Sequence, residues 1–127
     1  MSVSKFLNKK IIIFGSSREG RIVLDILTLY NIIPCCYIDN HSKKIGLTIS
    51  NIPIKSVSFI KELNKDEYII LIPSMYYNEM YKQLMDMQIP KTNISNIDIY
   101  YKPLNLFDIP YKMKFYFFMH KYFIKNK

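Results

Sequence analysis

The residues best suited to chemistry form a glycine-containing segment near the start of the chain, Gly15-Ser16-Ser17-Arg18-Glu19-Gly20. In the dinucleotide-binding pattern Gly-x-Gly-x-x-Gly, the first glycine permits a tight strand-to-helix turn, the second lets a phosphate approach the backbone, and the third lets helix and strand pack closely. Gly15 and Gly20 fill the first and third positions, and Ser17 fills the second. The Ser17 hydroxyl can donate to a phosphate oxygen, and the N–H groups of the following helix can bind an anion. The segment, Ser16 included, therefore predicts a phosphate-binding turn.

Arginine usage points to the same segment. The chain has 16 lysines but only two arginines, Arg18 and Arg21, and both lie within or directly after the glycine segment. A guanidinium group presents a planar fork of N–H donors that binds phosphate through two hydrogen bonds, so both arginines are predicted phosphate ligands. The alternative is that they pair with Glu19 or Asp25 at the surface.

A carboxylate follows at the distance where the dinucleotide-binding pattern expects one. Asp39 lies 24 positions beyond Gly15, at the end of a second apolar run. The pattern expects an acid here that accepts a hydrogen bond from a ribose hydroxyl. Its charge would repel a 2′-phosphate, so NAD or a nucleoside diphosphate is predicted in preference to NADP. The alternative is that Asp39 only begins the loop that continues through Asn40 and His41.

These residues need a strand, a turn and a helix in succession, and the hydrophobic pattern predicts such elements. Continuous apolar runs predict strands buried on both faces, whereas apolar residues at i, i+3/i+4 and i+7 predict helices. The predicted strands span 10–15, 34–39, 52–54, 68–73 and 94–100. The predicted helices run from Arg21 to before Asn31, from a Ser56 cap to Leu63, and from after Ser74 to before Pro90. This alternation predicts an α/β fold: a Rossmann-like, doubly wound, mostly parallel sheet of about four to five strands with helices on both faces.

A pair of tyrosines lies where ligands of open α/β sheets bind. Tyr76 and Tyr77 follow the strand predicted at 68–73, at the carboxyl edge of the sheet. Tyr77 shares the apolar stripe of the next helix and is expected in the core, so Tyr76 is the predicted stacking partner of a base. His41 is expected to be a solvated loop residue.

The sequence lacks the patterns that self-sufficient enzymes of comparable folds need. No tyrosine has a lysine four residues later, as short-chain dehydrogenases and epimerases require, and Arg21 stands where a P-loop has lysine. Cys35 and Cys36 are adjacent and have no further cysteine, which predicts buried free thiols rather than a metal site. We therefore expect a non-catalytic binding protein without a metal, and no catalytic residue is assigned. The alternative is a small enzyme that acts on a nucleotide sugar with catalytic groups supplied by a partner chain.

Four segments together resemble a known family: the strand with Gly-x-Ser-x-x-Gly-Arg, Tyr-Ile-Asp-Asn at 37–40, Ile-Pro-Ile at 52–54, and Tyr-Ile-Ile-Leu-Ile-Pro-Ser at 68–74. They look like the Rossmann-like nucleotide-binding domain of bacterial surface-polysaccharide enzymes. These include the amino-terminal domain of sugar O- and N-acyltransferases of the sialic-acid and bacillosamine type, and the related domain of nucleotide-sugar dehydratases and epimerases. The resemblance covers roughly residues 8–100 and implies nucleotide or nucleotide-sugar binding at Gly15, Ser17, Gly20 and Asp39. The turn histidine that the acyltransferases often carry and their hexapeptide-repeat domain are absent, so acyl transfer is not implied.

Length and charge suggest how the chain is organised. Half of the 127 residues are apolar, so we expect one nucleotide-binding domain, 1–108, followed by a basic aromatic tail, 109–127. The formal net charge is +8, and the tail holds five lysines and no acidic residue. The tail has three possible roles: a terminal helix packed on the sheet or a partner subunit, a contact of 111–127 with an anionic membrane surface, and nucleic-acid binding, which no reader motif supports. The sequence has no apolar run long enough to span a membrane and no signal peptide, which predicts a cytoplasmic protein. If the tail contacts a membrane surface, the protein is expected to be peripheral to that membrane.

The sequence thus predicts a binding domain for NAD, a nucleoside diphosphate or a nucleotide sugar of the UDP-sugar type. We expect it to be accessory to bacterial surface-glycan biosynthesis and to partner a second copy of itself or a larger glycan-synthesis enzyme. The alternative is a degenerate Rossmann interaction module whose tail docks on a membrane surface or on a partner enzyme.

Overall fold

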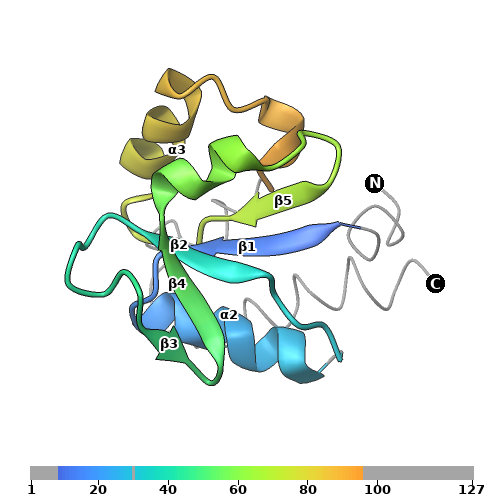
Figure 1. Cartoon of the computed structure of the whole chain (residues 1–127), viewed down its shortest axis with the longest axis vertical. Helices are drawn as coiled ribbons and strands as arrows, with labels where there is room; N and C mark the ends of the chain where they lie inside the picture. Colours follow the sequence, from blue (N-terminus) through green and yellow to red (C-terminus); the bar gives the residue numbers. More distant parts are fainter. Residues whose placement is uncertain (1–8, 30, 96–127) are drawn as a thin grey trace, which may run out of the picture.

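The computed structural model describes residues 9–29 and 31–95 (Figure 1). Its strands are β1 (Lys10–Phe14), β2 (Cys36–Asp39), β3 (Thr48–Ile49), β4 (Ile52–Ser56) and β5 (Tyr68–Leu71). Its α-helices are α2 (Arg18–Leu29) and α3 (Tyr77–Asp86), and its 3-10 helices are η1 (Val57–Glu62) and η2 (Lys91–Asn93). The strands form a five-stranded sheet in the order β3-β4-β2-β1-β5. All neighbours pair in parallel except β3 and β4, which are antiparallel, so the fold is α/β with a mostly parallel sheet, as predicted.

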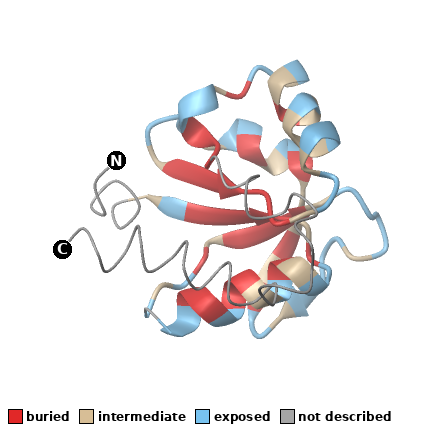
Figure 2. Ribbon diagram, turned by 180° about the vertical axis from the view of Figure 1, so that it is seen from behind, coloured by how far each residue is buried: buried red, intermediate tan, exposed pale blue. Residues whose placement is uncertain are grey.

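Helices cover the sheet on both faces, with α2 on one side and α3 and η1 on the other (Figures 1 and 2). Successive side chains of a strand point to opposite faces. Accordingly, Ile13 of β1 belongs to the core beneath α2, together with Leu27. The preceding residue, Ile12, belongs to the core beneath α3, together with Leu84. Because both faces of β1 are covered, its sequence is continuously apolar instead of alternating.

Both α-helices are followed, two residues after their last residue, by a residue in the left-handed conformation. Asn31 has φ of 59° and Gln88 has φ of 63°. In each case the next residue donates its backbone N–H to the carbonyl oxygen five residues earlier, at 3.0 Å, which is the hydrogen bond of a Schellman motif. The prediction that Asn31 stops the first helix is confirmed. The second helix ends at Asp86, ahead of the predicted stop at Pro90.

The first helix begins earlier than its periodicity predicts. The apolar pattern places its start at Arg21, but α2 starts at Arg18, and the Arg21 N–H donates to the Ser17 carbonyl oxygen at 3.1 Å. The first helical turn, 18–21, has no apolar side chain for the pattern to detect. The connection between β1 and α2 is therefore only three residues long, from Gly15 to Ser17.

Two features beside β4 also differ from expectation. Ser56 lies at the N-cap position of the following helix, as predicted, but its side chain makes no capping hydrogen bond. Instead, the Ser56 and Ser58 hydroxyls hydrogen bond to each other at 2.8 Å, and the helix is of the 3-10 type. The apolar pattern does not predict β3. This strand pairs with β4, and a two-residue turn, Ser50 and Asn51, joins the two strands. The φ angles of these residues, 51° and 69°, are typical of a tight hairpin turn. The pair Ser-Asn lacks the Asn-Gly signature that would reveal such a turn in a sequence.

The strand predicted at 94–100 is described only at its start. Ile94 forms a parallel bridge with Ile70 of β5, and the Ser95 N–H donates to the Ile70 carbonyl oxygen at 2.9 Å. The rest of that strand and the predicted tail, 109–127, lie outside the described residues. Within the described part of the chain, no helix has both the length and the apolar character that crossing a bilayer requires.

Gly20 determines how closely α2 approaches the turn. A Cβ atom at this position would lie 2.0 Å from the carbonyl oxygen of Gly15 and 3.3 Å from Cε1 of Tyr37. Alanine normally stabilises a helix relative to glycine by about 1 kcal/mol, but here the helix would have to move away from the turn. We expect Gly20→Ala to lower the free energy of unfolding by about 3 kcal/mol, measured by urea denaturation.

Gly46→Ala is the matched control for this substitution. Gly46 has φ of +94°, but nothing lies within 4 Å of its Cβ position. Only backbone strain is expected, about 1 kcal/mol. Equal losses of stability in the two variants would contradict the steric role of Gly20.

Candidate functional site

A cleft of about 330 Å³ opens at the carboxyl ends of β1 and β2, facing α3; we call it the β1–α3 cleft. The residues that line it are Phe14, Gly15, Asp39, Asn40, Tyr76, Glu79, Met80 and Gln83. Three predicted site residues, Gly15, Asp39 and Tyr76, therefore meet in one place although they are distant in sequence. The other predicted site residues lie on the adjoining turn and the first turn of α2: Ser16, Ser17, Arg18, Gly20 and Arg21.

The turn after β1 has the conformation that its glycines predict. Gly15 has φ of +106°, in the region that favours glycine. Its N–H donates to the Ile38 carbonyl oxygen at 2.8 Å, which ties the turn to β2. Because Gly20 has no side chain, the first turn of α2 lies directly against the Gly15 carbonyl group. The start of α2 is thereby held beside the ends of both strands.

Asp39 is bound by the turn itself. Ser16 is fully buried, and it donates to Oδ2 of Asp39 from both its backbone N–H, at 3.0 Å, and its hydroxyl, at 2.5 Å. The His41 N–H donates to Oδ1 at 2.8 Å. A carboxylate has about four acceptor positions, so roughly one position, on Oδ1, is left for a ligand hydroxyl. Asp39 thus holds the turn and the following loop in addition to facing the cleft.

These contacts affect the protonation of Asp39. Partial burial alone raises the pKa of its carboxyl group, but the hydrogen bonds from Ser16 and His41 and the positive charge of Lys44 outweigh burial and lower the pKa below its ordinary value. Asp39 is therefore ionised at neutral pH.

Cations gather around the start of α2. Lys44, from the loop after β2, donates to the Ser17 hydroxyl oxygen at 3.2 Å, so the Ser17 O–H remains available as a donor. Arg18 and Arg21 are exposed. Among the described residues, neither arginine forms an ion pair, including the surface pairs with Glu19 or Asp25 that the sequence allows. The sequence pattern does not identify Lys44, because its contact with Ser17 spans 27 positions.

One face of α3 forms the opposite wall of the cleft. Glu79, Met80 and Gln83 of α3, with Tyr76 directly before the helix, follow the i, i+3, i+4, i+7 spacing of a single helical face. Tyr76 is 62% exposed, so its ring is accessible to a ligand. Tyr77 packs against the core on the α3 side, as predicted. A search for polar residues at this spacing could have found Glu79 and Gln83 in the sequence.

An amide pair joins the two walls of the cleft. Nδ2 of Asn40 donates to Oε1 of Gln83 at 2.8 Å, and Nε2 of Gln83 donates to Oδ1 of Asn40 at 2.9 Å. The pair connects the loop after β2 to α3. Both amides lie on the lining of the cleft, where they can also meet a ligand.

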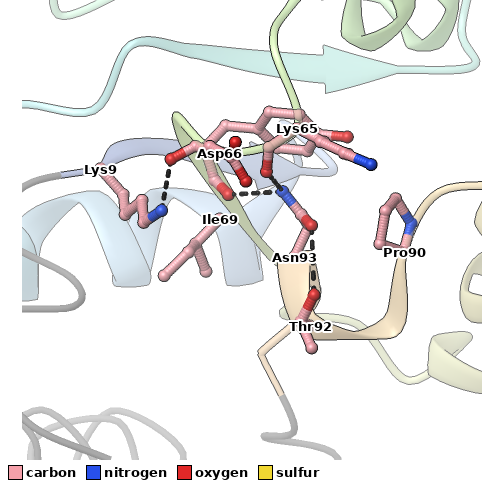
Figure 3. A pocket seen from close by; sticks show the side chains of 8 residues that line it. Lys9, Lys65, Asp66, Ile69, Pro90, Thr92 and Asn93 are labelled. Carbon is pink, nitrogen blue, oxygen red and sulfur yellow. Dashed lines mark hydrogen bonds between the residues drawn. The ribbon is translucent and has the colours of Figure 1, made fainter.

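Figure 3 shows a second pocket, of about 260 Å³, at the amino-terminal ends of β1 and β5. Asn93 is buried there and donates through its side-chain nitrogen to the carbonyl oxygens of Lys65 and Tyr68. The Lys9 ammonium group donates to the carbonyl oxygen of Asp66. These groups hold the backbone before β5 in place, so we assign this pocket a structural role.

The cysteines lie in the sheet region, away from the cleft lining. Cys35 and Cys36 are free thiols; Cys36 is buried, and burial raises its pKa to about 12. It is therefore protonated at neutral pH. Among the described residues, no group of three or more His, Cys, Asp and Glu side chains is placed to hold a metal ion.

We expect Asp39→Asn to lower the free energy of unfolding at pH 7 by about 1 to 2 kcal/mol, because charge-assisted hydrogen bonds to Ser16 and His41 are lost. The pKa of Asp39 is lowered in the folded state from its ordinary value of 3.8. Its contribution is therefore complete above pH 3.8 and disappears as the pH falls through the folded-state pKa. Urea denaturation of the wild type and of Asp39→Asn, at pH values between 7 and 3, measures this contribution to the free energy of unfolding. A stability difference between the two proteins that does not shrink at acid pH would contradict this role.

Comparison with known proteins identifies a family and a fold. No curated protein matches the chain. The structure of UDP-D-quinovosamine 4-dehydrogenase from Vibrio fischeri matches with a TM-score of 0.50 and 19% identity, over 72% of this chain and 81% of that one. The acetyltransferase domain of PglB from Neisseria gonorrhoeae, in complex with acetyl coenzyme A, matches with a TM-score of 0.47 and 14% identity, over 63% of this chain and 38% of that one.

At these identities the structural likeness concerns the α/β fold alone. The family model described as "C2185-like, N-terminal" matches residues 7–95, which is more than half of the chain and includes the whole β1–α3 cleft. The chain therefore belongs to the C2185-like, N-terminal family.

Proposed function

We propose that the chain binds a nucleoside diphosphate, a nucleotide sugar or NAD at the carboxyl edge of the sheet. The observation that carries this proposal is the turn itself: Gly15 leads in three residues to the start of α2, beside a cleft lined by Asp39 and Tyr76. Such an arrangement suits a ligand with a phosphate, a ribose and a base.

The phosphate would bind at the start of α2. The first N–H groups of a helix have no partner within the helix and lie at the positive end of its dipole. The Ser16 N–H already donates to Asp39, so the phosphate would accept hydrogen bonds from the backbone N–H and the hydroxyl of the next residue, Ser17. Arg18, Arg21 and Lys44 supply the positive charge that offsets the nearby carboxylate of Asp39.

The ribose would bind at Asp39. The Oδ1 atom accepts only the His41 N–H among the described residues, so it can accept a hydrogen bond from a ribose hydroxyl. Because the lowered pKa keeps Asp39 ionised, a 2′-phosphate would be repelled. NAD or a nucleoside diphosphate is therefore favoured over NADP.

We further infer a Rossmann-like, doubly wound sheet and a role accessory to bacterial surface-glycan biosynthesis. With β4 counted as the third parallel strand, the parallel strands follow the order 3-2-1-4, and helices lie on both faces, which supports this fold. The Vibrio fischeri protein, whose fold is similar, acts on a UDP-sugar by its description, and this supports UDP-sugars as the first ligands to test. The alternative function, an interaction module that docks through 109–127, depends on residues outside the described part of the chain.

Thermal-shift measurements with UDP, CDP, UDP-sugars and NAD test the proposal. Ligand at a hundredfold excess over Kd stabilises the folded state by about 2.7 kcal/mol, so at least one of these ligands should raise Tm by about 5 °C or more. Ser17→Glu should abolish the shift, because its carboxylate would occupy the start of α2. The acid itself suits a helix start, so this variant should fold normally.

Thr92→Glu is the matched control. Thr92 is exposed and lies at the opposite end of the sheet, beside the second pocket. This variant has the same change of charge and should keep the full thermal shift. The proposal fails if no ligand shifts the wild-type Tm, or if both variants lose the shift equally.

A further inference from the structure

We infer that the side-chain amides of Asn40 and Gln83 read the base of a single nucleoside bound in the β1–α3 cleft. This inference rests on the proposed function and makes it more specific. It names the part of the ligand that the cleft takes, and it distinguishes a nucleoside diphosphate from a dinucleotide.

The amide pair has hydrogen-bonding capacity to spare. Each side-chain amide has two N–H donors and two acceptor positions. The reciprocal bonds between Asn40 and Gln83, at 2.8 and 2.9 Å, use one donor and one acceptor position of each. One N–H and one lone pair of each amide therefore remain, on residues that line the cleft.

A nucleobase offers the complementary groups. The edge of a base presents a donor and an acceptor side by side, and Asn and Gln bind such edges through two hydrogen bonds. A base can add to the free positions of the pair and use both a donor and an acceptor there. An apolar group could use neither, and a purely anionic group could meet only the N–H donors.

Neighbouring residues place the base beside this pair. Asn40 directly follows Asp39, the proposed ribose acceptor, so a base attached to that ribose would lie next to Asn40. Tyr76, the residue directly before α3, precedes Gln83 by seven positions, and its exposed ring can stack on the base. Met80, which lies between them in sequence, and Phe14 add apolar side chains to the lining.

The size of the cleft matches one nucleoside. Small-molecule pockets have volumes of about 300 to 1,000 Å³, and the β1–α3 cleft, at about 330 Å³, is at the lower end of that range. One base and its ribose fill such a volume, so the second nucleoside of a dinucleotide would have to lie outside this cleft. We therefore expect a nucleoside diphosphate or its sugar derivative as the ligand of this site.

The test compares ligands with and without a base, using the full chain and isothermal titration calorimetry. The probes are UDP, ADP, NAD and ribose 5-phosphate, which has the ribose and phosphate but no base. We expect Asn40→Ala and Gln83→Leu to weaken binding of the preferred nucleoside diphosphate about tenfold, and to leave ribose 5-phosphate unchanged. Gln83→Glu keeps the size of the side chain but loses its N–H donors, so it should also weaken binding of the preferred nucleoside diphosphate.

Asn78→Leu is the matched control, because Asn78 is an exposed amide of α3 that does not line the cleft. Asn78→Leu should change neither the affinity for the preferred nucleoside diphosphate nor the affinity for ribose 5-phosphate. If Gln83→Leu weakens UDP, ADP and ribose 5-phosphate equally, the pair is a structural link between the loop and α3, and the inference is wrong. The same conclusion follows if wild-type protein binds ribose 5-phosphate as tightly as UDP and ADP.

Two further outcomes separate this inference from the proposed function. If wild-type protein binds none of the four probes and no ligand of the thermal-shift series raises its Tm, the proposed function itself is overturned, and the inference with it. If NAD binds more than tenfold tighter than ADP, both nucleosides are held and the single-nucleoside inference is overturned, while the proposed function stands.

Discussion

The close approach of α2 to the Gly15 carbonyl group positions the turn after β1, and through it the Asp39 carboxylate and the loop after β2. This approach is possible because Gly20 has no Cβ atom. Ser16 is then buried in the turn, where both of its donors reach the Asp39 carboxylate. Asp39 in turn fixes the following loop through the His41 N–H. Because Gly20 has no side chain, α2 contacts the turn, the turn binds the Asp39 carboxylate, and Asp39 binds the loop after β2.

The parallel core of this fold is predictable from sequence, whereas its boundaries and its edge are not. The strands β1, β2 and β5 are buried on both faces, so each is a continuous apolar run that stands out from the polar segments around it. The first turn of α2 lacks this signal because residues 18–21 contact the strand through glycine, not through an apolar side chain. The hairpin of β3 and β4 depends on two positive φ angles that Ser50 and Asn51 adopt without a glycine.

The candidate site also has one part that is predictable from sequence and another part that is not. Gly15, Gly20 and Asp39 could be predicted because the dinucleotide-binding pattern fixes their spacing over one strand–helix–strand unit. The contacts between Asn40 and Gln83, 43 positions apart, and between Lys44 and Ser17, 27 positions apart, depend on how the loop after β2 folds. The pattern also treats Asp39 as a group reserved for ligand. In the structure, most of its acceptor capacity is used by Ser16 and His41.

The short hairpin of β3 and β4 protects the outer edge of the sheet. Unpaired backbone groups at a sheet edge attract other extended chains and promote aggregation. Here the Ile54 N–H donates to the Leu47 carbonyl oxygen at 2.9 Å, and β3 beyond it is only two residues long. At the opposite edge, Ile94 and Ser95 lie beside Ile70 of β5. The described sheet therefore offers a second extended chain only a two-residue strand at one edge, and at the other edge a strand that Ile94 and Ser95 partly cover.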